Sequence, residues 1–198
     1  MKKVYVLFIA LTVALSVSAQ ECVDLGLSVN WASCNLGATS PEDDGVPFVS
    51  GTVHEFTPGL SVTDITIYDH NEDYSGNPLY DAATFLWGTL WRTPTYKEWV
   101  ELMTQCTWVW CKFESTTGLK IKGYEITGPN GNKIFLPAGT DNNGKYMSGG
   151  GYMCSTPINN SRKMNTFVFT NKRKQMYFQQ YIGNNLYGLP VRAVSDKK

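Results

Sequence analysis

The segment from Trp87 to Trp99 constrains the fold of this chain more than any other, because thirteen positions hold three tryptophans, an arginine, a proline and a helix start. Within it, Thr95-Tyr96-Lys97-Glu98 has the pattern of a capping box. The Thr95 hydroxyl can accept the backbone N–H of Glu98, and the Glu98 carboxylate can accept that of Thr95. Pro94 disfavours an earlier start. We therefore predict one main helix near residues 95–105.

The predicted helix carries one apolar stripe, formed by Trp99, Leu102, Met103 and Cys106 at i, i+3, i+4 and i+7. Arg92 lies just before the helix among large apolar residues. It is either a structural arginine, bonded to backbone carbonyls or to a carboxylate such as Glu98, or a site for an anion. We favour structural roles for the following set: Trp91, Arg92, Thr95, Glu98 and Trp99.

Patterns elsewhere in the chain predict short helices and many strands. Apolar residues alternate with small or polar ones over residues 25–32, which predicts a strand. Ser40-Pro41 and Asp81-Ala82 each have the pattern of a helix start. After the main helix come strand-like segments at 107–113, 119–127, 133–137, 167–170, 175–180 and 191–194, and the second and third of these flank an Asn-Gly turn. This order predicts the α+β class, with small antiparallel sheets and long loops.

The first residues have the pattern of a secretory leader. Met1-Lys2-Lys3 is basic, and the apolar run that follows to Leu15 is too short to span a bilayer. Small residues then predict a signal peptide at 1–19, cleaved after Ala19. Cys22 comes too late to carry a lipid anchor. We expect residues 20–198 to form a single domain that is secreted or held in the periplasm or cell envelope, without a membrane span after cleavage.

Export permits disulfides, and the chain has five cysteines, an odd number. Cys34 with Cys106 is the first pairing to expect, and two buried free thiols are the alternative. No two cysteines have the C-x-x-C spacing, and only His54 and His70 could join them as nitrogen ligands. A zinc site is therefore not expected.

Charge and motif patterns argue against several other classes of function. The 17 basic and 17 acidic residues balance, and Lys172-Arg173-Lys174 is the longest basic run, so we expect no nucleic-acid partner. Oxygen-bearing side chains alternate over Asp69, Asn71, Asp73 and Ser75, as at the start of a calcium loop. However, position six is not glycine, and no glutamate closes the loop. We expect no cofactor, with calcium as the open alternative.

The sequence contains no recognisable catalytic constellation. A serine or cysteine hydrolase needs a nucleophile, a histidine base and an orienting acid, but His54 and His70 belong to no such motif. A glycosidase needs two opposed carboxylates, whereas Glu98 and Glu101 lie three positions apart on one helix. We therefore predict that the protein is not an enzyme.

Several long motifs occur in the order found in one known family. They are Val23–Ala38, the Trp-Gly-x-x-Trp-Arg-x-Pro-Thr-x-x-Glu-Trp block, Gly128–Gly139, Ser155-Thr156-Pro157 and Gly188–Val194. Together they resemble the Fibrobacter succinogenes major paralogous domain family of secreted and surface bacterial proteins. The resemblance implies a C-type-lectin-like fold, shared with formylglycine-generating enzymes, and a role in adhesion or ligand display. Two departures are Met153-Cys154, where Trp-Ser is common, and Pro190, where serine is usual.

Aromatic and amide side chains gather near the C-terminal end. Tyrosine offers rigid contact area, and asparagine and glutamine offer adaptable hydrogen bonds, a combination that suits sugars and proteins. The alternative is that the tyrosines pack on the core and the amides only keep a loop soluble. We predict an exported, non-catalytic module that binds a glycan or protein ligand, and a structural or assembly component of the cell envelope is the alternative. The candidate ligand-binding residues are Tyr177, Gln179, Tyr181, Asn184, Asn185 and Tyr187.

Overall fold

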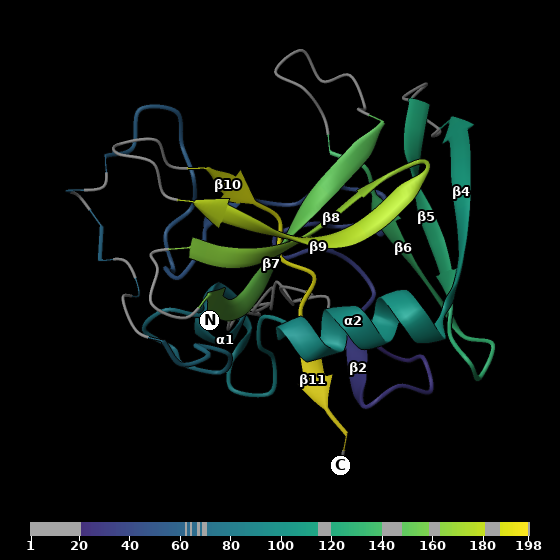
Figure 1. Ribbon diagram of the computed structural model, residues 1–198, viewed down its shortest axis with the longest axis horizontal. Coiled ribbons are helices and arrows are strands. Elements are labelled where there is room, and N and C mark those ends of the chain that lie inside the picture. Colours follow the sequence, from purple (N-terminus) through teal and green to yellow (C-terminus); the bar gives the residue numbers. More distant parts are fainter. Residues whose placement is uncertain are drawn as a thin grey trace, which may run out of the picture.

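The computed structural model describes residues 21–61, 63, 65–66, 68, 71–114, 120–139, 148–158, 163–180 and 187–197, and the side chains of 113–114 and 178–180 are not described. These ranges contain two helices and eleven strands in small antiparallel sheets, so the predicted α+β class is confirmed (Figure 1). In chain order the elements are β1 (Cys22–Asp24), β2 (Val29–Ala32), β3 (Phe48–Val49), α1 (Ala82–Trp87), α2 (Tyr96–Gln105), β4 (Thr107–Glu114), β5 (Lys120–Thr127), β6 (Lys133–Pro137), β7 (Gly149–Ile158), β8 (Lys163–Thr170), β9 (Arg173–Gln180), β10 (Gly188–Leu189) and β11 (Val194–Asp196).

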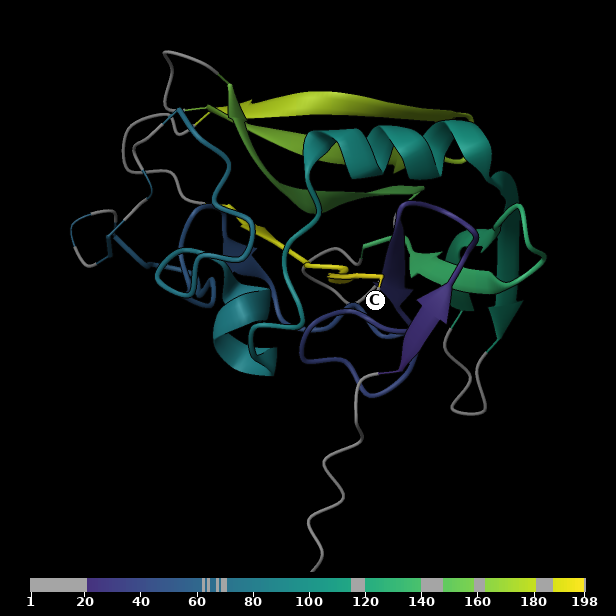
Figure 2. The same cartoon turned by 90° about the horizontal axis from the view of Figure 1, so that it is seen from below.

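The strands form three sheets of three strands and one sheet of two. Their orders are β1-β2-β11, β4-β5-β6, β7-β8-β9 and β10-β3. Because β1 and β11 both pair with β2, the two ends of the described chain lie in one sheet. Helix α2 runs beside the β7-β8-β9 sheet and contacts β7 and β9 (Figure 2).

The predicted main helix is confirmed, and its first turn has the predicted capping box. The Thr95 hydroxyl accepts the Glu98 N–H, and the Glu98 carboxylate accepts the Thr95 N–H. Trp99 is fully buried and stacks on Phe167, with ring centroids 4.6 Å apart. Its indole N–H donates to the Met153 carbonyl. The apolar stripe of α2 thus fixes the helix on the sheet.

Arg92 has the structural role that the sequence favours. Its guanidinium donates to both carboxylate oxygens of Glu98, at 3.0 and 2.5 Å, and to Asp196 at 2.6 Å. Burial by itself would lower the pKa of Arg92, but the hydrogen bonds to these carboxylates raise it above the ordinary value. Two carboxylates therefore occupy the positions that an anion would need.

A second buried cluster surrounds α1, which begins where Asp81-Ala82 predicts it. The buried Asp81 carboxylate accepts the N–H groups of Ala83 and Thr84 at the start of α1. It also accepts the N–H and hydroxyl of Thr93. Trp91 packs against this cluster and meets Trp87 edge to face, with ring centroids 5.6 Å apart.

Three local predictions differ from the structure. The strand expected at 191–194 contributes only Val194, the first residue of β11. Ser40-Pro41 does not start a helix: the Asp43 N–H reaches the Ser40 carbonyl, but the Asp43 carboxylate then binds the Gly45 N–H and closes a turn. Residues 25–32 show the expected alternation of buried and exposed side chains, but only β2, at the end of this segment, is a strand. The residues before β2 form a turn in which the Asp24 carboxylate accepts the Gly26 N–H.

The predicted Cys34–Cys106 disulfide is wrong: every described cysteine is a free thiol. The buried Cys34 thiol lies beside the Ala38 carbonyl, which accepts a hydrogen bond from it. Cys106 packs against the core cluster around Trp99. Cys34 is not among the residues of that cluster, and sequence spacing alone cannot reveal such a difference.

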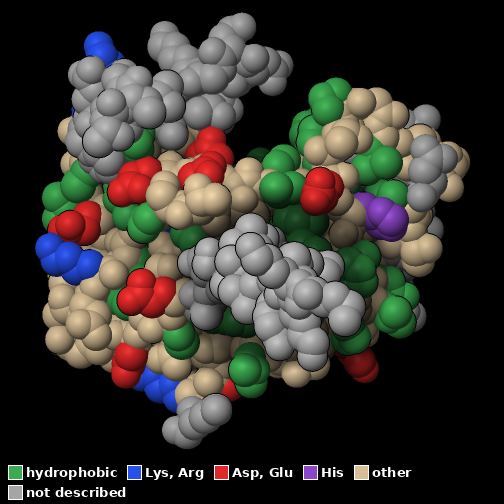
Figure 3. Space-filling model, turned by 180° about the vertical axis from the view of Figure 1, so that it is seen from behind, with side chains coloured by type: hydrophobic (Ala, Val, Ile, Leu, Met, Phe, Trp, Pro, Cys, Tyr) green, Lys and Arg blue, Asp and Glu red, His purple; other side chains and the backbone are tan. Residues whose placement is uncertain are grey.

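Residues 1–20 lie outside the described residues, so the predicted leader at 1–19 stays a prediction. Within the described ranges, neither helix has the length and apolar character needed to cross a bilayer. On the face opposite to that of Figure 1, acidic side chains are dispersed and hydrophobic ones lie recessed in a hollow (Figure 3).

Candidate functional site

The predicted C-terminal binding surface is described only in part. Tyr177, on the edge strand β9, is 53% exposed, and Tyr187, directly before β10, is 50% exposed. Gln179 lies in β9, but its side chain is not among those described. Tyr181, Asn184 and Asn185 fall outside the described residues. Both tyrosines that can be assessed therefore present aromatic surface to solvent.

A cleft of about 390 Å³ opens at β10, the strand that directly follows Tyr187 in the chain, and we call it the β10 cleft. Four segments that are distant in the sequence form its walls: the turn before β3, the end of β6, the start of β7, and β10. The lining residues are Asp44, Gly45, Pro47, Phe56, Pro137, Gly139, Gly150, Gly151, Tyr152, Gly188, Leu189 and Pro190.

Glycines in the β10 cleft allow the chain to approach itself closely. A Cβ atom at Gly188 would lie 2.4 Å from the Phe56 Cβ, so only glycine lets β10 pass over that ring. At Gly149, next to the lining, a Cβ atom would lie 2.2 Å from the Phe169 carbonyl oxygen. The Gly149-Gly150-Gly151 run is thus a closely packed strand that leaves backbone, rather than side chains, facing the cleft.

Behind the cleft wall lies a buried polar cluster. The Tyr152 hydroxyl donates to the Pro137 carbonyl at 3.0 Å and accepts from the Asn35 amide at 3.4 Å. Asn35 also accepts the Nε–H of Arg192, which is fully buried. Arg192 Nη1 donates to the carbonyls of Ala32 and Ser33. This network ties β7 to the turn at Asp44 and fixes the shape of the cleft.

The ionisation of that cluster limits its chemistry. Burial raises the pKa of Tyr152 far above its ordinary value, so the hydroxyl stays protonated and cannot serve as a base. Burial lowers the pKa of Arg192, whose hydrogen bonds go to an amide and to carbonyls. Asp44 supplies the carboxylate that lines the cleft.

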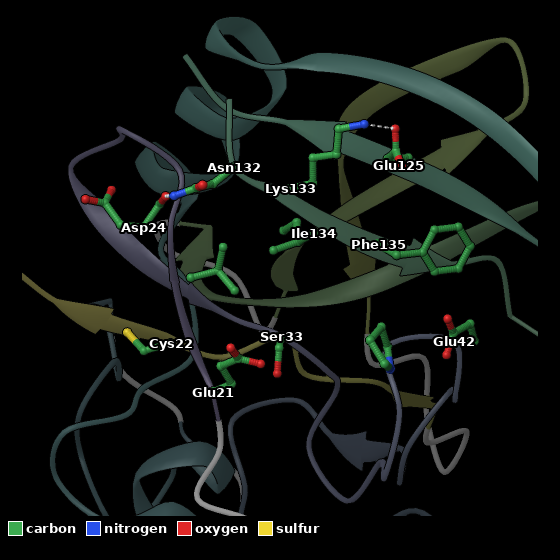
Figure 4. A pocket seen from close by; sticks show the side chains of 12 residues that line it. Glu21, Cys22, Asp24, Ser33, Glu42, Glu125, Asn132, Lys133, Ile134 and Phe135 are labelled. Atoms are coloured by element: carbon green, nitrogen blue, oxygen red, sulfur yellow. Dashed lines mark hydrogen bonds and ion pairs between the residues drawn. The ribbon is translucent and has the colours of Figure 1, made fainter. Parts of the chain in front are cut away.

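A second and wider groove, of about 690 Å³, separates β1 from β6 (Figure 4). Its charged residues are largely paired: Lys133 contacts Glu125 at 2.7 Å, and Lys197 contacts Asp24 at 2.7 Å. The hydrogen bond from Lys197 lowers the pKa of Asp24. None of the residues predicted to bind ligand lines this groove or the β10 cleft, but the cleft residue Gly188 directly follows the predicted Tyr187 in the chain.

The described residues place no nucleophile beside a histidine. His54 is exposed and makes no side-chain hydrogen bond to a serine or cysteine within the described ranges, and His70 lies outside them. Burial raises the pKa of Cys154 to about 12 and that of Cys106 to about 11. Both thiols are therefore protonated at neutral pH, the form that is a poor nucleophile.

The residues of the suspected calcium loop make other contacts. The Asp73 carboxylate accepts the Ser75 N–H and the Thr156 hydroxyl. The Ser75 hydroxyl donates to the Thr93 carbonyl and accepts from Arg92. Asp69 lies outside the described residues. Among those that are described, no three His, Cys, Asp or Glu side chains lie close enough together to hold a metal ion.

Sequence reasoning found two exposed tyrosines, Tyr177 and Tyr187, but missed the β10 cleft. Phe56 and Asp44 lie in loops without periodicity, and nothing in their neighbourhood in the sequence indicates that they meet β10. The only usable signal was the concentration of glycine at 149–151 and at Gly188. Comparisons with known protein families, with curated proteins and with solved structures found no match for this chain.

Proposed function

We propose that this protein is an exported, non-catalytic binding module that recognises a glycan or a protein through its C-terminal surface. The observation that carries the proposal is the β10 cleft, whose lining residue Gly188 directly follows the exposed Tyr187 in the chain. Concave sites that combine apolar walls with a few polar groups are the usual places where ligands bind. Here the walls are Phe56, Leu189 and prolines, and the polar groups are backbone amides and Asp44.

The chemistry of the surface supports a neutral, hydroxyl-rich or peptide-like ligand. Phe56 and Tyr187 can cover the apolar face of a sugar ring or of an apolar side chain. Exposed backbone at Gly150 and Gly151 can exchange hydrogen bonds with hydroxyl or amide groups. The resemblance to the major paralogous domain family, with its implied C-type-lectin-like fold and surface location, is consistent with this role and is part of the proposal.

The proposal is tested by measuring binding to a glycan array, and to envelope proteins in pull-downs, with single and combined variants. Phe56→Ala removes an aromatic ring that lines the cleft, Tyr187→Ala removes the exposed ring directly before β10, and Tyr177→Ala removes the exposed ring on β9. We expect the combined variant to lose binding by at least about tenfold, since each aromatic contact contributes on the order of 1 kcal/mol. Tyr96→Ala, which alters an exposed tyrosine outside the cleft, is the matched control.

The result decides between the two ligand classes and the binding role itself. If the unmodified protein binds a glycan and the combined variant does not, the protein is a lectin. If the unmodified protein captures an envelope protein and the combined variant does not, it is a protein receptor. Full binding by the combined variant would overturn the assignment of the site. An assembly role in the cell envelope is the second candidate, and the free edge of strand β4 favours it.

A further inference from the structure

Strand β4 is an edge strand whose outer side has no partner within the described chain. It is eight residues long and pairs only with β5, without interruption from Thr107 to Glu114. In Figure 1 it forms the outer side of the β4-β5-β6 sheet, with no other element beyond it. An open strand edge of this length offers a template for another strand.

The hydrogen-bond pattern identifies which backbone groups point outward. The Gly128 N–H bonds to the Asn132 carbonyl, and the Ala138 N–H bonds to the Lys122 carbonyl. In an antiparallel ladder the bonded pairs alternate, so the even-numbered residues of β5 face β6 and the odd-numbered ones face β4.

The same alternation continues into β4. Its odd-numbered residues bond to β5, and the N–H and C=O groups of its even-numbered residues point away from the sheet. The outward residues are Trp108, Trp110, Lys112 and Glu114.

The edge of β4 lacks two of the usual protections against strand pairing, and it holds one exposed cation, Lys112. It contains no proline, and its register with β5 has no bulge. By contrast β9, the other edge strand of eight residues, begins with the adjacent cations Arg173-Lys174. On β4, Val109 is 50% exposed and Cys111 is partly exposed, so an apolar strip runs along the outer face next to the open edge.

We propose that a second copy of this chain docks on β4, with the two β4 strands antiparallel across a two-fold axis. The four outward residues are centred on Cys111, so the register that pairs all of them places Cys111 opposite Cys111 of the partner subunit. In this register Lys112, the exposed cation of the strand, lies opposite the partner's Trp110, which favours a cation–π contact. The dimer joins two three-stranded sheets into one of six strands, and closed two-fold symmetry explains why the edge needs no other protection.

Self-association is measured first as molar mass at increasing protein concentration, by light scattering and analytical ultracentrifugation. The unmodified protein is expected to reach twice the monomer mass. Lys112→Pro removes an outward N–H without loss of a bond to β5, so it is expected to halve the mass while the circular dichroism spectrum is retained. Lys112→Ala, which keeps the backbone N–H, is the matched control and remains dimeric.

Cross-linking tests the register independently of folding changes in the variants. The Cα atoms of a directly opposed, non-hydrogen-bonded pair lie about 4.5 Å apart, within the range that a disulfide spans. Oxidation with copper–phenanthroline is therefore expected to give a covalent dimer that Cys111→Ser abolishes. Cys22→Ser, at the exposed thiol, and Cys106→Ser, at a thiol as partly exposed as Cys111, are expected to retain the covalent dimer. A monomer at every concentration, or a dimer that survives Lys112→Pro without a Cys111 cross-link, would overturn the proposal.

This inference goes beyond the proposed binding function and does not depend on it. The variants at β4 leave Phe56, Tyr177 and Tyr187 unchanged, so a monomeric Lys112→Pro protein can be tested for ligand binding separately. Loss of the dimer with retained glycan or protein binding would separate the two roles.

Discussion

Replacing Glu98 tests whether the Arg92 cluster holds the start of α2 in place. Glu98 accepts two hydrogen bonds from Arg92, at 3.0 and 2.5 Å, and one from the Thr95 N–H at 2.7 Å. The side chains of Arg92 and Glu98 are only 18% and 10% exposed. Glu98→Ala therefore removes a helix cap and one partner of a mostly buried ion pair in a single step.

The expected magnitude follows from these two losses. Removing one partner of a buried pair costs about 3–5 kcal/mol. Here the cost is smaller, because Asp196 still contacts Arg92 at 2.6 Å and keeps its charge paired. Loss of the cap alone, in Thr95→Ala, costs about 1 kcal/mol. We expect about 3 kcal/mol for Glu98→Ala, with Glu98→Gln in between because the amide oxygen can still accept the Thr95 N–H.

Urea unfolding followed by tryptophan fluorescence and far-ultraviolet circular dichroism measures these differences. Glu125→Ala is the matched control, because Glu125 also pairs with a cation but is 41% exposed. Its expected cost is below about 1 kcal/mol. A Glu98→Ala variant no less stable than Thr95→Ala would show that the guanidinium contributes nothing beyond the cap, and the reasoning would fail.

Three further predictions concern the core and the backbone. Trp99→Ala, at a fully buried ring, should lower the free energy of unfolding by about 3–5 kcal/mol in the same urea assay. Burial raises the thiol pKa from 9.0 to about 12 at Cys154 and to about 11 at Cys106, so the native state keeps protons that the unfolded chain releases. The contribution of these thiols to stability should thus be level below pH 9.0 and fall above it, so the loss of stability between neutral and alkaline pH should be less steep in Cys154→Ala. Gly45→Ala should be more destabilising than Gly59→Ala by at least about 1 kcal/mol in thermal unfolding. Both glycines have positive φ, but a Cβ atom at Gly45 would lie 2.4 Å from the Leu36 carbonyl oxygen, whereas Gly59 faces open space.

Much of the fold could be predicted because its signals are local. The capping box at Thr95 and Glu98 spans three positions, and the Asn-Gly turn before β6 fixes a hairpin within five residues. Ser40-Pro41 failed because a competing local contact, from the Asp43 carboxylate to the Gly45 N–H, closes a turn first. Local signals are thus reliable where a single conformation satisfies them.

The candidate site could be predicted only in part. Composition pointed to Tyr177 and Tyr187, which are exposed, but gave no sign of the β10 cleft. The network behind its wall joins Asn35 to Arg192, 157 positions apart. The Cys34–Cys106 pairing failed for the same reason, because cysteine spacing contains no information about which thiols become neighbours.

The sequence by itself determined where α2 begins, how the β5-β6 hairpin turns and which faces of these elements are apolar. These features depend on hydrogen bonds and periodicities within a few residues. Tertiary structure alone decided that β10 passes over Phe56 to form a cleft, that Arg92 meets Asp196, and that β4 is left at an edge. Such features depend on contacts between distant segments, whose partners are selected only when the whole core packs.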